Sequence, residues 1–455
     1  MDNWKFHLLT FGCKVNQYES QSLREAWQRQ GGVECDDPAG AAVICVNSCA
    51  ITATGERDAR AALLRLRRLA PQARLVLTGC AAQLPGVLTP PRRRNAGQAL
   101  PSADLIVPQA DKARLLDAGW RRAASALPRP AAGRNEAFPP FAIDGFRRAR
   151  PVLKVQDGCE HRCTYCIVPL TRGQCRSRAP QEAIAEARRL FRAGYAEIML
   201  SGINLRQYGR DRPEYGDFWH LLRRLDQALA PEFAGRARLR ISSLEPGQLD
   251  ARGVDSLLAC RLVCPHLHIS LQHASREVLR RMGRGHYRAE ALREAVRALR
   301  GQWPVMGLGA DIILGFPGET EEDVACLLDF VAGTPFSYAH VFPYSARPGT
   351  AAARFAGQID PQVKQERARR LREAVARQRE AFLRAQCELP LMRLAADAAG
   401  GRHDRQDGTG ADIRGVNEYY VPCRLREADG GPLSGLVPVR PLALAEDGLL
   451  VERIG

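Results

Sequence analysis

Three cysteines in one short segment carry the most distinctive chemistry in this chain. Cys159, Cys163 and Cys166 follow a short apolar run and have the spacing C-x3-C-x2-C. Three thiolates from one tight loop suit an iron–sulfur cluster, and they leave one iron without a protein ligand. A structural zinc ion would need a fourth cysteine or histidine, and His161, inside the loop, is badly placed to supply it. We interpret the loop as a cluster site, with zinc or three unligated thiols as the alternatives.

Three more cysteines follow predicted strands near the start of the chain. Strands at 5–12, 41–46 and 74–78, with helices between them, predict a parallel α/β sheet. Ligands of such sheets collect beyond the carboxyl ends of the strands. The cysteines at these ends are Cys13, Cys49 and Cys80. Their convergence would allow a second cluster, whereas simple burial, the usual state of a free cysteine, is the alternative.

The rest of the chain predicts two further folded units. Strands separated by helical segments indicate an incomplete α/β barrel with its site at the carboxyl ends of the strands. After a charged helix at 360–383, short apolar runs split by glycine and aspartate indicate a small β-barrel. The central strands are expected at 197–200, 238–243, 266–272, 309–315 and 338–342.

We therefore expect an α/β protein in three parts. The predicted divisions are an N-terminal parallel-sheet domain (1–122), a linker (123–145), a central incomplete barrel (146–380) and a C-terminal β-barrel (381–455). A proline-containing segment at 84–103, with the run Arg92–Arg94, is expected to be a long loop that contacts RNA phosphates or solvent.

Charge and cysteine content narrow the class of protein. The 66 lysines and arginines exceed the 50 acidic residues and give a net charge of +16, which favours a nucleic-acid partner. A compositional preference for arginine is the alternative. The 14 cysteines are too irregularly spaced, in too long a chain, for a disulfide scaffold. With no apolar signal sequence and no apolar run of about 18 residues, we expect a cytoplasmic protein with reduced thiols.

The cysteine motifs resemble a known family. The Cys159 loop, with Tyr165 before its last cysteine, is similar to that of the radical S-adenosylmethionine (radical SAM) superfamily. The segments 10–20, 46–52 and 78–81 resemble the N-terminal domain of the radical SAM methylthiotransferases. This resemblance implies that the Cys159 loop holds a 4Fe-4S cluster whose open iron binds SAM and whose electron generates a 5′-deoxyadenosyl radical. It also implies a second 4Fe-4S cluster on Cys13, Cys49 and Cys80.

The resemblance also implies further site residues. Those expected to contact SAM are Gly202, Ser242, Ser243, Glu245, Gln272 and Gly315. A plain turn is the alternative for Gly202, and the residues after Gln272 depart from the family pattern. No acid–base catalytic residue is expected, because the adenine C2–H bond is too strong and too weakly acidic for a side-chain base.

The C-terminal barrel resembles the TRAM domain, an RNA-binding unit. Its Tyr419 and Tyr420 would stack on bases or pack in the barrel. In the central unit, Arg280, Arg281 and Arg284 are candidates for RNA phosphate contacts, with a solvated face as the alternative.

The segment Gly12–Gln17 most resembles the branch that modifies N6-threonylcarbamoyladenosine in tRNA, and other branches usually differ directly after its cysteine. We expect conversion of this nucleoside at position 37 to its 2-methylthio derivative. The expected partners are a tRNA anticodon stem-loop and a low-potential electron donor, with no membrane and no protein partner. The alternatives are isopentenyladenosine or a ribosomal-protein aspartate as substrate, or a non-catalytic zinc-containing RNA-binding protein.

Overall fold

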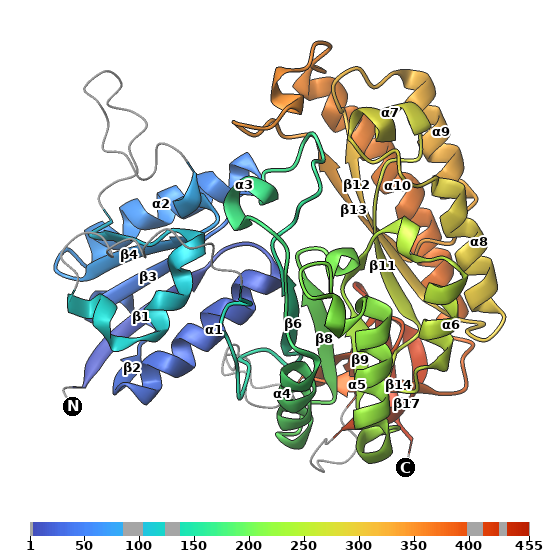
Figure 1. Cartoon of the computed structure of the whole chain (residues 1–455). Helices are drawn as coiled ribbons and strands as arrows, with labels where there is room; N and C mark the ends of the chain where they lie inside the picture. Colours follow the sequence, from blue (N-terminus) through green and yellow to red (C-terminus); the bar gives the residue numbers. More distant parts are fainter. Residues whose placement is uncertain (1–2, 85–102, 123–136, 398–412, 427–434, 455) are drawn as a thin grey trace.

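The computed structural model describes residues 3–84, 103–122, 137–397, 413–426 and 435–454 (Figure 1). The Arg92–Arg94 run and residues 123–136 of the predicted linker lie outside the described residues.

The N-terminal part is a parallel five-stranded sheet between two helices, as the sequence predicts. Alternate side chains of the strands face opposite layers: Phe6 and Cys45 pack with α1, and Ile44 and Leu75 pack with α2. The strand order is β2-β1-β3-β4-β5. The elements are β1 (Trp4–Thr10), α1 (Lys14–Arg29), β2 (Gly32–Glu34), β3 (Val43–Ser48), α2 (Ala53–Leu69), β4 (Arg74–Gly79) and β5 (Leu105–Ile106).

The central part is the predicted incomplete barrel of parallel strands. Two four-stranded sheets, β7-β6-β8-β9 and β10-β11-β12-β13, adjoin where Leu239 bridges to Val263. β7 is the antiparallel edge strand of the first sheet. The strands are β6 (Val152–Asp157), β7 (Arg176–Ser177), β8 (Glu197–Gly202), β9 (Arg238–Ile241), β10 (Ser243–Leu244), β11 (His266–Gln272), β12 (Gly307–Leu314) and β13 (Tyr338–Pro343).

Helices cover the outer face of this barrel (Figure 1). Their apolar sides pack on the outward residues of the strands, such as Ile269, Ile312 and Val341. The helices of the central part are α3 (Val168–Arg172), which lies against the N-terminal part, α4 (Pro180–Arg192), α5 (Phe218–Phe233), α6 (Ala251–Ala259), α7 (Arg276–Arg281), α8 (Ala289–Arg300), α9 (Glu321–Ala332) and α10 (Pro361–Gln386). No described helix is long and apolar enough to cross a membrane.

The C-terminal part is a closed five-stranded β-barrel, which confirms the predicted fold. Its core contains Met392, Leu394, Val439 and Val451. The strand order is β14-β15-β16-β18-β17. The strands are β14 (Met392–Ala396), β15 (Ile413–Val416), β16 (Pro422–Leu425), β17 (Leu436–Leu444) and β18 (Leu449–Arg453).

A buried ion-pair network joins this barrel to the central one. The fully buried carboxylate of Glu197 accepts hydrogen bonds from Arg238 Nε at 2.6 Å and Arg240 Nε at 2.7 Å. Both guanidinium groups also donate to backbone carbonyls of the C-terminal barrel, including those of Val416 and Asn417 at 2.8 and 2.9 Å. The network therefore fixes the C-terminal barrel against the amino end of the central strands.

We expect Glu197→Gln to lower the free energy of unfolding by about 3–5 kcal/mol, since it leaves two buried guanidinium groups without their carboxylate. Burial would raise the pKa of Glu197, but Arg240 and Arg238 outweigh it and lower the pKa to about 2. This contribution to stability is complete above the usual glutamate pKa of 4.5 and is lost as pH falls toward about 2. Urea unfolding at several pH values measures both effects. Glu294→Gln, at an exposed position on α8, is the control.

Candidate functional site

The loop after β6 presents Cys159, Cys163 and Cys166 at the carboxyl-end face of the barrel. Cys159 N–H donates to Gly173 O at 3.0 Å, and Cys166 N–H donates to Cys163 O at 3.0 Å. These bonds fold the loop so that its three thiols interact electrostatically with one another. Burial raises the pKa of the Cys166 thiol to about 12. Thiolates at this position therefore require a compensating cation such as a metal centre.

Two polar side chains contact sulfurs of this loop. Asn204 Nδ2 lies 3.7 Å from Cys159 Sγ, and Arg284 Nη1 lies 3.8 Å from Cys163 Sγ. Arg284 is 5% exposed and donates to Ser270 O at 3.1 Å. The prediction that Arg284 contacts RNA phosphates or solvent is therefore wrong. Of its two predicted companions, Arg280 is exposed and paired with Glu277, and Arg281 donates to Gly318 O at 3.0 Å.

Cys13, Cys49 and Cys80 follow β1, β3 and β4 and converge at the carboxyl-end edge of the first sheet. A Cβ atom on Gly12 would lie 2.7 Å from Cys49 Sγ, so the loop before Cys13 passes directly beside Cys49. Gly79 has a φ of +93°, and a Cβ atom there would lie 2.3 Å from Ser48 O. The glycines thus allow the strand ends to approach closely. The Cys49 thiol interacts electrostatically with those of Cys80 and Cys13, and burial raises its pKa to about 11.

Neither cysteine trio is spaced to hold a single metal ion. Two thiolates on one zinc ion lie about 3.8 Å apart, since each Zn–S bond is about 2.3 Å and the geometry is tetrahedral. Among the described residues, neither cysteine trio has its sulfurs within 4.8 Å of one another. Three separated sulfurs instead suit corners of a cluster with several irons.

A buried charge network ties the first sheet to the barrel beside both trios. Glu19 of α1 accepts from Lys112 at 2.6 Å, Lys154 at 2.7 Å and Arg172 at 2.9 Å, and all four side chains are buried. Burial would raise the pKa of Glu19, but the charges of Arg172, Lys112 and Lys154 hold it well below its usual value. Asp157, before the Cys159 loop, shares Lys154 and Arg172.

Arg172 connects the two trios. It ends α3, shortly after Cys166, and interacts electrostatically with Cys80 and Cys13. Its Nη2 donates to Asn16 Oδ1 at 2.7 Å. The amide of Asn16 in turn donates to carbonyls near Cys13 and Cys49, those of Phe11 and Ser48, at 3.0 and 2.9 Å. The buried guanidinium group of Arg172 therefore ties the segment that follows Cys166 to the loops that carry Cys13 and Cys49.

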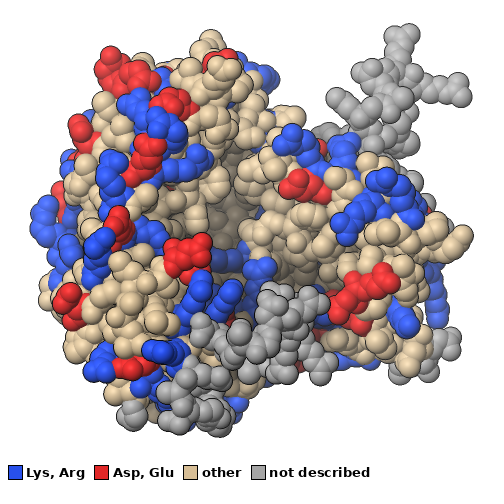
Figure 2. Space-filling view, turned by 180° about the vertical axis from the view of Figure 1, so that it is seen from behind, with Lys and Arg blue, Asp and Glu red and all other residues tan. Residues whose placement is uncertain are grey.

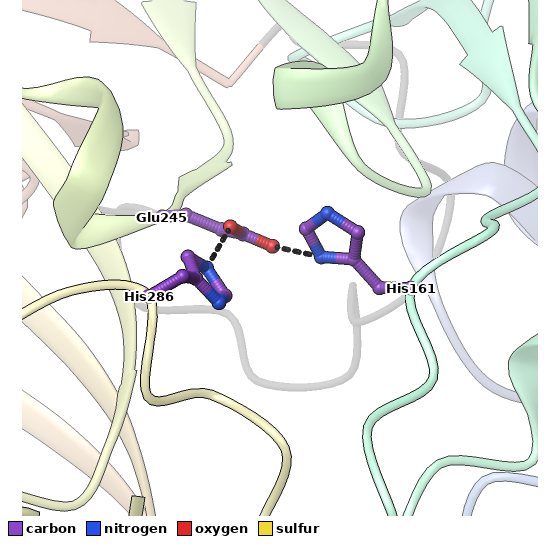
Figure 3. A group of neighbouring side chains, drawn as sticks. All are labelled: His161, Glu245 and His286. Atoms are coloured by element: carbon purple, nitrogen blue, oxygen red, sulfur yellow. Dashed lines mark hydrogen bonds and ion pairs between the residues drawn. The ribbon is translucent and has the colours of Figure 1, made fainter. Parts of the chain in front are cut away.

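Glu245 lies at the centre of a polar group beside the Cys159 loop (Figure 3). Its carboxylate lies 3.1 Å from His161 Nδ1 and 3.1 Å from His286 Nε2. It also accepts from Asn204 Nδ2 at 2.9 Å and Arg206 Nη1 at 3.1 Å. Burial would raise the pKa of Glu245, but His161 and His286 outweigh it and lower the pKa strongly. Glu245 is thus an ionised acceptor at the position where a SAM contact is predicted.

The other predicted SAM contacts lie at the same strand ends. Gly202 ends β8 and packs on Gln156, while Ser242 and Ser243 join β9 to β10. Gln272 ends β11 with a φ of +63°, one of two non-glycine residues with positive φ in the described chain. Such strain is typical of residues held at functional sites. Gly315 N–H donates to Glu319 Oε1 at 2.9 Å. Glu319 precedes the first turn of α9, and its carboxylate stabilises the backbone at Gly315.

Sequence reasoning missed several residues of this site. No sequence motif marks Arg172, Lys112 or Lys154. However, Lys154 lies in a buried strand, which indicates that a carboxylate lies opposite it. Tyr420 was a candidate for base stacking. Instead, it packs in the amino end of the central barrel, with its ring centroid 4.8 Å from that of His266.

A cysteine loop at the carboxyl-end face of an incomplete parallel barrel defines a radical SAM enzyme. Residues 153–331 match the Radical SAM superfamily, and residues 5–89 match a family described as Uncharacterized protein family UPF0004. The fold is similar to that of the radical SAM methyltransferase TsrM from Kitasatospora setae, with a TM-score of 0.51. That alignment covers 77% of each chain at 16% identity and shows the fold alone.

Two relatives define the family more closely. The threonylcarbamoyladenosine tRNA methylthiotransferase MtaB of Bacillus subtilis is 37% identical over 80% of this chain and 78% of its own length. The tRNA-2-methylthio-N(6)-dimethylallyladenosine synthase of Syntrophomonas wolfei is 32% identical over 81% of each chain. The chain belongs to the radical SAM methylthiotransferase family. Membership implies SAM and a 4Fe-4S cluster as cofactors.

Replacing Glu19 tests whether the charge network holds the two halves of the site together. Glu19→Gln leaves Lys154 and Arg172 with Asp157 alone and Lys112 without a carboxylate, so we expect the free energy of unfolding to fall by about 3–5 kcal/mol. Urea unfolding followed by tryptophan fluorescence measures it, since Trp27 and Trp120 are buried in the N-terminal part. Asp58→Asn, at an exposed position on α2, is the control. An unfolding midpoint equal to that of the control would contradict this role.

Proposed function

We propose that this chain is a tRNA methylthiotransferase that converts N6-threonylcarbamoyladenosine at position 37 to its 2-methylthio derivative. The carrying observation is that buried Arg172 ties the segment after Cys166 to the loops that carry Cys13 and Cys49, because both metal centres must reach one nucleobase. Cys159, Cys163 and Cys166 would hold the cluster that binds SAM, and Cys13, Cys49 and Cys80 would hold the second 4Fe-4S cluster. When bound, these clusters and SAM supply the radical and the sulfur that no side chain of the protein can supply.

The protein's own residues would position and shield these groups. Glu245, with Gly202, Ser242, Ser243, Gln272 and Gly315, would line the SAM site at the strand ends. Arg284 and Asn204 contact the sulfurs of the Cys159 loop and would offset the negative charge of a thiolate-bound cluster there. The Glu19 network would keep the two cysteine loops in register and exclude water between them.

The choice of substrate follows the relatives and the first cysteine motif. The relative in B. subtilis carries threonylcarbamoyladenosine in its name, and that in S. wolfei carries dimethylallyladenosine. Lys14, directly after Cys13, matches the branch that acts on threonylcarbamoyladenosine. The proposed partners are the tRNA anticodon stem-loop, bound with help from the C-terminal TRAM-like barrel (381–455), and a low-potential electron donor.

Iron analysis tests the assignment of the six cysteines. After anaerobic reconstitution, we expect about eight iron atoms per chain in the native protein and about four after joint replacement of Cys13, Cys49 and Cys80 by alanine. That variant should still cleave SAM under reductant, because the Cys159 loop is intact. Replacing the Cys159 trio should also leave about four irons but abolish SAM cleavage. Replacing Cys45, which is buried within β3, by alanine should change neither. Zinc without iron in the native protein would refute both clusters.

Nucleoside profiling tests the substrate. We expect tRNA from cells that lack this gene to lose 2-methylthio-N6-threonylcarbamoyladenosine and to accumulate its precursor, as measured by mass spectrometry. Restoring the native gene should reverse the change, and a gene without the Cys159 trio should not. Loss of the methylthio group from dimethylallyladenosine alone would instead assign the chain to the other branch.

A further inference from the structure

A second group of two histidines and a carboxylate lies within the central barrel. His268 on β11, Asp311 on β12 and His340 on β13 have their ligand atoms within 4.8 Å of one another. Their sequence neighbours Ile269 and Ala310 pack outward into the core under the helices. Since successive residues of a strand face opposite sides, these polar side chains face the inside of the barrel.

The protein itself satisfies His268 but leaves His340 free. His268 Nε2 lies 3.1 Å from Asp311 Oδ1, and its Nδ1 lies 2.9 Å from the hydroxyl of Tyr338. Gly309 makes this possible, because a Cβ atom there would lie 2.4 Å from that hydroxyl. His340 is exposed, and its ring makes no hydrogen bond to any described residue. Asp311 is 25% exposed and keeps an oxygen for another partner.

The charge of Lys14, in the N-terminal part, acts on this group. Lys14 is the first residue of α1, next to Cys13, and within the described chain its amino group has no hydrogen bond or ion pair. Burial lowers the pKa of His266, partial desolvation lowers that of His340, and the charge of Lys14 contributes to both shifts. The charge of Lys14 is therefore within electrostatic range of the barrel histidines. Figure 2 shows a hollow between the N-terminal part and the barrel, with basic side chains at its lower edge.

Tyr420 of the C-terminal barrel packs at the amino end of the inside of the central barrel. The ring of Tyr420 lies with its centroid 4.8 Å from that of His266 and 5.7 Å from that of Tyr338. The inside of the central barrel therefore carries a polar group and ends against aromatic rings. With Lys14, this group offers two donors, Lys14 and His340, and one free acceptor, Asp311.

We propose that Lys14, His340 and Asp311 bind the threonylcarbamoyl substituent of the substrate base and select for it. This inference rests on the proposed function and goes further by assigning the groups that read the substituent. The substituent carries a carboxylate, a hydroxyl group and ureido N–H groups. Lys14 and His340 donate to its carboxylate, and Asp311 accepts from its hydroxyl group.

The same groups would reject a hydrocarbon substituent. An isopentenyl group offers no hydrogen bond, so its entry would leave Lys14 and Asp311 desolvated and without partners. Sites built around polar substituents discriminate strongly against analogues that lack them for this reason. A metal ion fits less well, because both ring nitrogens of His268 already have protein partners at hydrogen-bond distance.

The test compares anticodon stem-loops that differ only in the N6 substituent of position 37. These carry threonylcarbamoyl, its carboxamide analogue, which has lost the negative charge, or isopentenyl. Dissociation constants for the full chain are measured by fluorescence anisotropy, and methylthio product by mass spectrometry. We expect the native protein to bind the threonylcarbamoyl loop about tenfold to a hundredfold more tightly than the carboxamide, the effect of a charged hydrogen bond.

Lys14→Met and His340→Phe should each reduce this ratio toward one. Lys5→Met, an exposed position at the amino end of β1, is the matched control and should keep the native ratio. His340 is far in sequence from every cluster cysteine, so its variant remains informative if Lys14→Met impairs cluster loading, which iron analysis detects.

The outcomes separate this inference from the proposed function. Variants that keep the native ratio of the two dissociation constants would overturn the inference. This includes variants that bind the threonylcarbamoyl and carboxamide stem-loops more weakly by the same factor. Loss of one zinc or iron ion per chain in His340→Phe with both clusters intact would also overturn the inference, since that would make the group a metal site. A native protein that methylthiolates only the isopentenyl loop would instead refute the proposed function.

Discussion

The buried carboxylate of Glu19 is the constraint on which the site depends. It lies in α1 of the first sheet, yet its three cationic partners come from the segment after β5, from β6 and from the end of α3. An unpaired charge in this interior would cost several kcal/mol, so the three segments must meet at one place. Because Asn16 and Arg172 extend the network to both cysteine loops, the position of the metal-binding residues follows from this one set of ion pairs.

The inner face of the barrel is divided between two polar groups with different surroundings. The group around Glu245 is at the strand ends, beside the cysteine loop, and is saturated with donors from four side chains. The group around His268 lies nearer the amino ends of the strands. His340 and Asp311 in this group can still form hydrogen bonds to a ligand. The outer face carries apolar residues such as Leu267, Ile269 and Ile312 at the alternating positions. One set of strands thus supplies a core on one side and two distinct recognition surfaces on the other.

The sequence was sufficient for the strands, the parallel topology and the convergence of the early cysteines. The strands follow from the alternation of apolar residues, which is a local pattern in the sequence. The convergence of the cysteines follows because sites lie at the carboxyl ends of parallel strands. The sequence was insufficient for Arg284 and Tyr420. A basic run and an aromatic pair look like surface recognition residues, and only long-range packing shows that one lies against a sulfur and the other in a neighbouring barrel. The three-residue edge strand β2 was also missed, because it is too short for an alternating pattern.

The position of Tyr420 gives the C-terminal barrel a structural role in the central barrel. The C-terminal barrel covers the amino end of the central barrel through Tyr420, a residue in the left-handed conformation with a φ of +69°. Removing that barrel would take away the ring that packs on His266 and Tyr338 and would open the amino end of the central barrel to solvent.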